Sequence, residues 1–303
     1  MRVSIGVAAS ITAALVLATG SSALFAHDDG PQWSLATAVT EVNSAAPDGC
    51  PIESRDGLSL FIASTRSGTT GNDIWAADRA SLAEPFSGLT KLARPVNGPT
   101  NDFCPTPIDG NYLLFVSERP GPETCNAGPG RGDMYVVRRN AAEGWGQPRH
   151  LGCVENGTGP NTNGAEFSPS LVNLGRETYL YFSSDVSGNQ DIYRSRLDAK
   201  GQFGPPVPVT ELNSEYDDRM PNVRSDGREI VFSSNRPLES GATNGFDVYA
   251  SQRHHTGKRW SAPVNLGPNV NTAGNETRSS ISWDGKRLYF GRDGDIFTSR
   301  RLR

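Results

Sequence analysis

Beyond an apolar N-terminal stretch, hydrophobic and polar residues follow one another in short runs that carry strong β-forming residues. No segment after that stretch shows the 3.6-residue period of an amphipathic helix. The runs are separated by turn residues, among them many of the 33 glycines and 21 prolines in the 303-residue chain. Short strands bounded by turn residues indicate an all-β fold.

The runs are organised in five repeating units. Each unit opens on an aromatic residue, and the openings are 53, 59, 58 and 57 residues apart: Trp33, Phe86, Trp145, Phe203 and Trp260. An asparagine stands near the start of the loop that follows: Asn43, Asn97, Asn156, Asn213 and Asn271. Each unit ends on a strand that begins Asp-apolar-aromatic, at Asp73, Asp133, Asp191, Asp247 and Asp295.

Four short strands in each of five units predict a five-bladed β-propeller with four-stranded antiparallel blades. The propeller spans residues 33–303. The chain stops just after the third strand of the last unit, and residues 33–39 match a fourth strand. We therefore expect the N-terminal strand to complete the last blade and to close the ring.

Residues 218–237 and 247–253 carry the repeat most clearly, as DRMPNVRSDGREIVFSSNRP followed by DVYASQR. This pattern resembles the TolB-type, WD-like propeller repeat of exported bacterial proteins. The resemblance implies binding of proteins or glycans, and some five-bladed propellers of other families are glycosidases.

The N-terminus predicts export. Residues 1–26 combine Arg2, an apolar run and small residues that offer cleavage after Ala23 or Ala26, which is typical of a secretory signal peptide. Residues 27–32 form a short linker. We expect a periplasmic or extracellular monomer with no stable membrane insertion after cleavage. The net charge of −4 argues against a nucleic-acid partner.

Four cysteines suit an oxidising compartment. None of them forms a CxxC pair, so no metal site is predicted from them. Three connectivities are open, of which we favour Cys50–Cys104 with Cys125–Cys153.

A carboxylate recurs three residues before the proline, or its equivalent, of each innermost strand. These five "ring acids" should surround one mouth of the central channel: Asp48, Asp102, Glu166, Asp218 and Glu276. Arg219 and Arg278 lie near them in sequence and are candidate partners. A structural role, in which each acid caps backbone N–H groups of the next blade, is the interpretation that we favour.

Two functional interpretations stay open for the ring acids. Two of them could act as the acid and base of a glycoside hydrolase. Alternatively, the oxygen-rich ring could hold a structural calcium ion. No other cofactor is expected. The third-strand aspartates Asp73, Asp133 and Asp247 are expected to pair with Arg66, Arg119 and Arg236, respectively.

The acid-bearing mouth also receives the longest insertions, at residues 120–132, 155–165 and 237–245. Recognition commonly uses loops on a rigid scaffold. The sequence thus favours a scaffold that binds a protein or a cell-envelope glycan through this mouth. A carbohydrate-active hydrolase is the alternative.

Overall fold

The computed structural model describes residues 31–302, except residues 70, 121–124, 126–130, 141, 143 and 239–244. The predicted signal peptide and most of the linker lie outside these residues, as do large parts of the insertions at 120–132 and 237–245. All regular structure in the described part of the chain is β-strand, and no helix there could cross a membrane.

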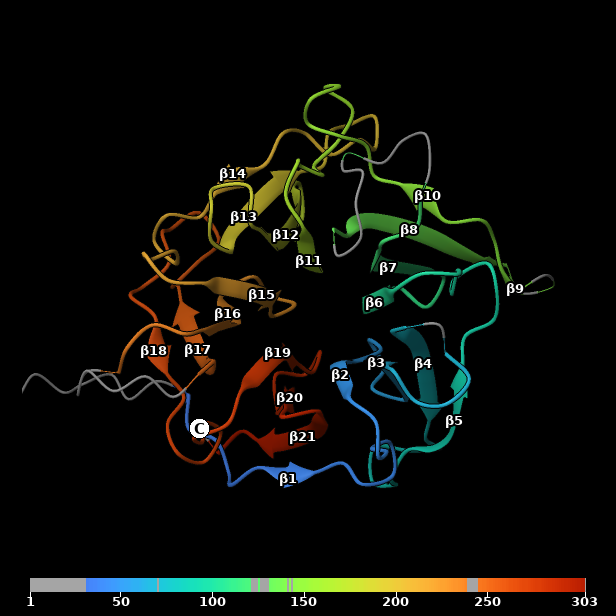
Figure 1. Cartoon of the computed structure of the whole chain (residues 1–303). Coiled ribbons are helices and arrows are strands. Elements are labelled where there is room, and N and C mark those ends of the chain that lie inside the picture. Colours follow the sequence, from blue (N-terminus) through green and yellow to red (C-terminus); the bar gives the residue numbers. More distant parts are fainter. Residues whose placement is uncertain are drawn as a thin grey trace, which may run out of the picture.

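The strands form five antiparallel sheets around a central axis, as predicted (Figure 1). The innermost strands face the axis: β2 (Asp48–Glu53), β6 (Asp102–Ile108), β11 (Glu166–Asn173), β15 (Asp218–Val223) and β19 (Glu276–Ile281). The second strands are β3 (Ser59–Ser64), β7 (Tyr112–Ser117), β12 (Thr178–Ser184), β16 (Glu229–Ser234) and β20 (Arg287–Arg292).

The third strands are β4 (Asp73–Asp78), β8 (Asp133–Asn140), β13 (Asp191–Arg196), β17 (Asp247–Gln252) and β21 (Asp295–Arg300). The outermost strands are β5 (Ser87–Lys91), β10 (Arg149–His150), β14 (Val207–Pro208), β18 (Val264–Asn265) and β1 (Thr37–Ala38). In the second blade β9 (Gly144–Trp145) also pairs with β8.

Closure of the ring is confirmed. β1 pairs with β21, in the register Thr37 to Thr298, so the N-terminal strand completes the fifth blade (Figure 1). Trp33 adds an isolated bridge to Arg301. The regular strand is therefore shorter than residues 33–39, but the whole predicted segment follows the edge of this blade.

The repeated aromatic residues pack in the apolar layers between blades. Trp33, Phe86 and Trp260 are 2–5% exposed. Each lies under an arginine that follows its blade's third strand, for example Arg253, whose Cζ is 4.1 Å from the Trp260 ring centre. Burial of the ring and a cation–π contact explain why an aromatic residue recurs at this position.

Five asparagines clip the third strands to the loops that join the blades. In each blade the side-chain oxygen accepts the N–H of the second residue of the third strand, and the amide nitrogen donates to that residue's carbonyl: Asn43, Asn97, Asn161, Asn213 and Asn271. The third asparagine is Asn161, so our prediction of Asn156 at this position is wrong. The loop at 155–165 is longer than its counterparts, so the asparagine that reaches the strand comes later.

This clip generates a prediction. Asn97→Asp keeps the acceptor for Ile74 N–H but removes the donor to the carbonyls of Ile74 and Leu92, and it places a charge where Asn97 is 2% exposed. We expect a loss of about 2–4 kcal/mol in the free energy of unfolding, measured by denaturant titration. Asn163→Asp, at an exposed position, is the control. Equal stability of the two variants would contradict the role of the clip.

Candidate functional site at the channel mouth

The ring acids occupy equivalent positions, as the repeat predicts. Each is the first residue of its innermost strand and is 0–3% exposed. Each backbone N–H donates to the carbonyl just before the third strand of the preceding blade, at 2.7–3.0 Å: Gly294, Asn72, Gly132, Gln190 and Phe246. Five hydrogen bonds thus join the blades into a closed ring at this mouth.

The carboxylates themselves hold the loops between blades. Each accepts the backbone N–H of the residue four positions earlier: Ser44, Gly98, Thr162, Ser214 and Thr272. In four blades the hydroxyl of that residue donates as well. An innermost strand is therefore connected through its first side chain to the loop that precedes it. The acids cap backbone N–H groups as expected, but in this loop and not in the next blade.

Four ring acids also bind an arginine from the end of the second strand. Arg66 contacts Asp48 at 2.5 Å, Arg119 contacts Asp102 at 2.6 Å and Arg292 contacts Glu276 at 2.7 Å. Arg236 pairs with Asp218 in the same way. The predicted pairing of Arg66, Arg119 and Arg236 with the third-strand aspartates is therefore wrong.

The reason is local. A serine two residues earlier, such as Ser64, accepts the Arg66 Nε–H at 2.8 Å, and the guanidinium Nη2 then reaches Asp48 on the innermost strand. The third-strand aspartates contact side chains of the outermost strand instead. Asp73 pairs with Lys91 at 2.6 Å, Asp133 with His150 at 3.2 Å, and Asp247 accepts from Asn265.

Glu166 is the exception among the ring acids. Val186 stands where the other long hairpins carry arginine, and Glu166 Oε1 accepts from Thr162 and Ser184 only. Burial raises the pKa of Glu166 well above its ordinary value, and the nearby Asp133 raises it further. The proton-bound form is thus favoured here, in the blade that lacks a counter-charge.

Arg219 and Arg278 are not partners of the ring acids, which corrects our prediction. The Arg219 guanidinium lies over the Phe246 ring, 3.5 Å from its centre. Burial lowers the pKa of Arg219, and the charge of Asp217 opposes that shift. Arg278 is 1% exposed and reaches the second blade, where its Nη2 donates to the Pro105 carbonyl at 3.2 Å.

The partly accessible side chains at the mouth include the residue that follows each ring acid in its strand. Side chains alternate along a strand, so the second residue of each innermost strand faces away from the buried acid. This position is half-buried in all five blades: Gly49, Phe103, Phe167, Arg219 and Thr277. The Phe103 and Phe167 rings are adjacent, with centres 5.7 Å apart. We call Phe103, Phe167, Arg219 and Phe246 the mouth residues. The three aromatics were not predicted, because, unlike the ring acids, they do not recur in all five units.

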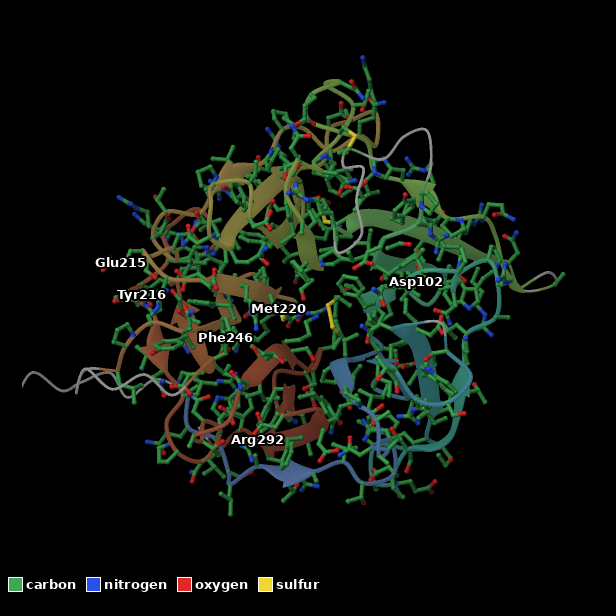
Figure 2. All side chains as sticks on the ribbon, in the orientation of Figure 1. Asp102, Glu215, Tyr216, Met220, Phe246 and Arg292 are labelled. Atoms are coloured by element: carbon green, nitrogen blue, oxygen red, sulfur yellow. A yellow bond between two sulfur atoms is a disulfide. The ribbon has the colours of Figure 1, made fainter. Side chains whose placement is uncertain are left out.

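The third residue of each innermost strand adopts positive φ, and a β-bulge follows the second residue in every blade: Cys50, Cys104, Ser168, Met220 and Arg278. A bulge redirects a side chain. These five "bulge residues" turn toward the axis, and Figure 2 shows Met220 near its centre. Cys50 and Cys104 form a disulfide there, as predicted, and Ser168 Oγ donates to Cys104 Sγ at 3.3 Å.

The second predicted disulfide, Cys125–Cys153, is also confirmed. Both sulfurs lie within 4.8 Å of a His150 ring nitrogen, but their bond to each other engages them. A cavity of about 380 Å³ adjoins this disulfide and is lined by residues such as Arg149, Gly152 and Phe203. The described residues of its lining include no carboxylate.

Comparison with solved structures finds the same fold in proteins of very different sequence. No family model and no curated protein sequence matches the chain. A thermostable family-43 glycoside hydrolase superimposes with TM-score 0.57 at 13% identity, covering 88% of this chain and 93% of that one. The α-L-arabinofuranosidase of Podospora anserina, solved with cellotriose, gives 0.54 at 13% identity, covering 90% and 97%.

A TolB structure from Agrobacterium tumefaciens aligns at 16% identity over 86% of this chain and 92% of that one, with TM-score 0.43. The five antiparallel sheets show the propeller, whereas the TolB-type resemblance is not confirmed. Identities this low establish the shared fold alone.

The ring acids yield a paired prediction. Asp218→Asn should lower the free energy of unfolding by about 2–3 kcal/mol, because it leaves Arg236 without its counter-charge. The loss should be near the low end of the range for buried ion pairs, since the Arg236 side chain is 18% exposed. Glu166→Gln should be neutral or stabilising at neutral pH, since it removes an uncompensated buried carboxyl.

The pH dependence separates these variants further. The folded-state pKa of Glu166 lies above its unfolded value, so the native state holds the extra proton and the contribution of Glu166 to stability falls as pH rises above about 4.5 toward the folded pKa. Glu166→Gln should flatten this fall in denaturant titrations across pH. A steeper or unchanged slope would contradict the assignment.

Proposed function

We propose that this chain is an exported carbohydrate-directed propeller that binds a glycan at the channel mouth, on Phe103, Phe167, Arg219 and Phe246. The observation that carries the proposal is the contrast between two neighbouring positions. The ring acids are buried and engaged in holding the blades together, whereas the aromatic residues next to them stay partly accessible.

The chemistry of the mouth residues fits a sugar. The faces of pyranose and furanose rings are apolar and pack on aromatic side chains, while hydroxyl or carboxylate oxygens accept hydrogen bonds from a guanidinium. Arg219 supports this role because its Nε is buried without a partner among the described residues. The family-43 hydrolase and the arabinofuranosidase, the latter solved with cellotriose, add an analogy at the level of the fold.

Two features support export. The N-terminal residues 1–26 have the composition of a signal peptide, and both disulfides suit an oxidising compartment. A cell-envelope or extracellular glycan is therefore the ligand class that we propose over a protein partner.

Binding is tested with a glycan array followed by calorimetry on the strongest ligand. Phe167→Ala and Phe246→Ala should each weaken binding at least tenfold, since each removes a stacking surface. Trp283→Ala is the matched control, because Trp283 is 49% exposed in the turn between β19 and β20, on the opposite face. No glycan bound by the wild type, or equal loss in all three variants, would refute the proposal.

Hydrolysis is the second candidate function, and Glu166 is the observation that favours it. A carboxyl group with a raised pKa can donate a proton to a leaving oxygen. Its burial is the obstacle, since a substrate would reach it only after the loop at Thr162 moves. The other ring acids are poorer candidates because each is bound to an arginine.

The two functions are distinguished by turnover. We expect no release of reducing sugar from arabinan, xylan or other glycans bound on the array, and unchanged binding by Glu166→Gln. Turnover by the wild type that disappears in Glu166→Gln, with binding retained, would establish a hydrolase and overturn the binding-only function.

A further inference from the structure

Arg278 is a fully buried cation on the propeller axis. It is the bulge residue of β19 in the fifth blade, and its side chain crosses to the second blade. There Nη2 donates to the Pro105 carbonyl at 3.2 Å and to Thr106 Oγ1 at 3.1 Å. The Nε and Nη1 groups have no partner among the described residues, and neither has the hydroxyl of the adjacent Ser279.

No described carboxylate balances the charge of Arg278. Glu276, two residues earlier, is paired with Arg292, and the other ring acids have the partners given above. Burial alone acts on the guanidinium and lowers its pKa to about 9. A buried cation with two unused donors is costly unless a negative charge or an acceptor reaches it.

The surroundings select the kind of ligand. The guanidinium repels metal cations, and its free donors require an acceptor. The other bulge residues are a disulfide, Ser168 and Met220, which supply little space and no negative charge. A compact monovalent anion suits a site beside these side chains better than an oxyanion, which is larger and, when multiply charged, more costly to desolvate.

We propose that the axial channel binds a halide ion, chloride under physiological conditions, on the Nε and Nη1 groups of Arg278. The ion neutralises the buried guanidinium and completes the link between the fifth and second blades, which are not neighbours in the ring. Its role is structural and does not depend on the glycan site.

Bromide provides the direct test, because its anomalous scattering distinguishes it from water. Wild-type crystals are grown or soaked in sodium bromide, and an anomalous map is calculated at the bromine edge. We expect a peak within hydrogen-bonding distance of Arg278 Nε or Nη1. A map without a peak at Arg278, with water or nothing beside the guanidinium, would overturn the proposal, as would a bromide peak that appears only on the surface.

Thermal stability provides the second arm. At equal ionic strength, sodium chloride should raise the Tm of the wild type by a few degrees over sodium gluconate, since only the native state binds the ion. Arg278→Met, which keeps much of the volume without the charge, should lose this difference. Arg55→Met, at an exposed position, should retain it. Equal Tm of the wild type in both salts would contradict the site, even if Arg278→Met fails to fold.

Discussion

The structure depends on one carboxylate at the start of every innermost strand. Its backbone N–H bonds to the preceding blade, its side chain caps the loop that leads into it, and in four blades it binds an arginine from the neighbouring strand. Each acid thereby connects a loop, two strands and the adjacent blade. Because five short sheets have little surface to bury individually, such connections fix where each innermost strand begins and where its next two side chains point.

The two positions that follow inherit this geometry. The second residue is held at the mouth, where Phe103, Phe167 and Arg219 stay half-buried. The third is turned inward by a bulge, so that a disulfide, a serine, a methionine and Arg278 share the axis. Stability, recognition and the filling of the channel are thus divided among three successive residues. This division explains how a fold found in glycoside hydrolases can present a mouth whose most regular acids are buried and engaged in contacts between loops and strands.

The repeat made the architecture predictable, because equivalent residues in five units must occupy equivalent places in blades. Closure by residues 33–39 and the Cys50–Cys104 disulfide followed from the same equivalence, whereas Cys125–Cys153 was favoured because both loops emerge on one face of a blade. The acid that Arg66 binds was not predictable. The choice between the ring acid and the third-strand aspartate depends on how the hydrogen bond to Ser64 orients the arginine side chain. Asn161 was missed because an insertion shifts the residue that reaches the strand. The bulges left no sequence signal, as residues as different as Cys50, Met220 and Arg278 occupy them.

The central claim is that the mouth residues, and not the ring acids, contact the ligand. A crystal structure with an oligosaccharide identified on the array tests it most directly. We predict a sugar ring against Phe167 or Phe246 and hydrogen bonds from Arg219, with every ring acid still bound to its loop and beyond hydrogen-bonding distance of the sugar. Two ring carboxylates on either side of a glycosidic oxygen would contradict the account.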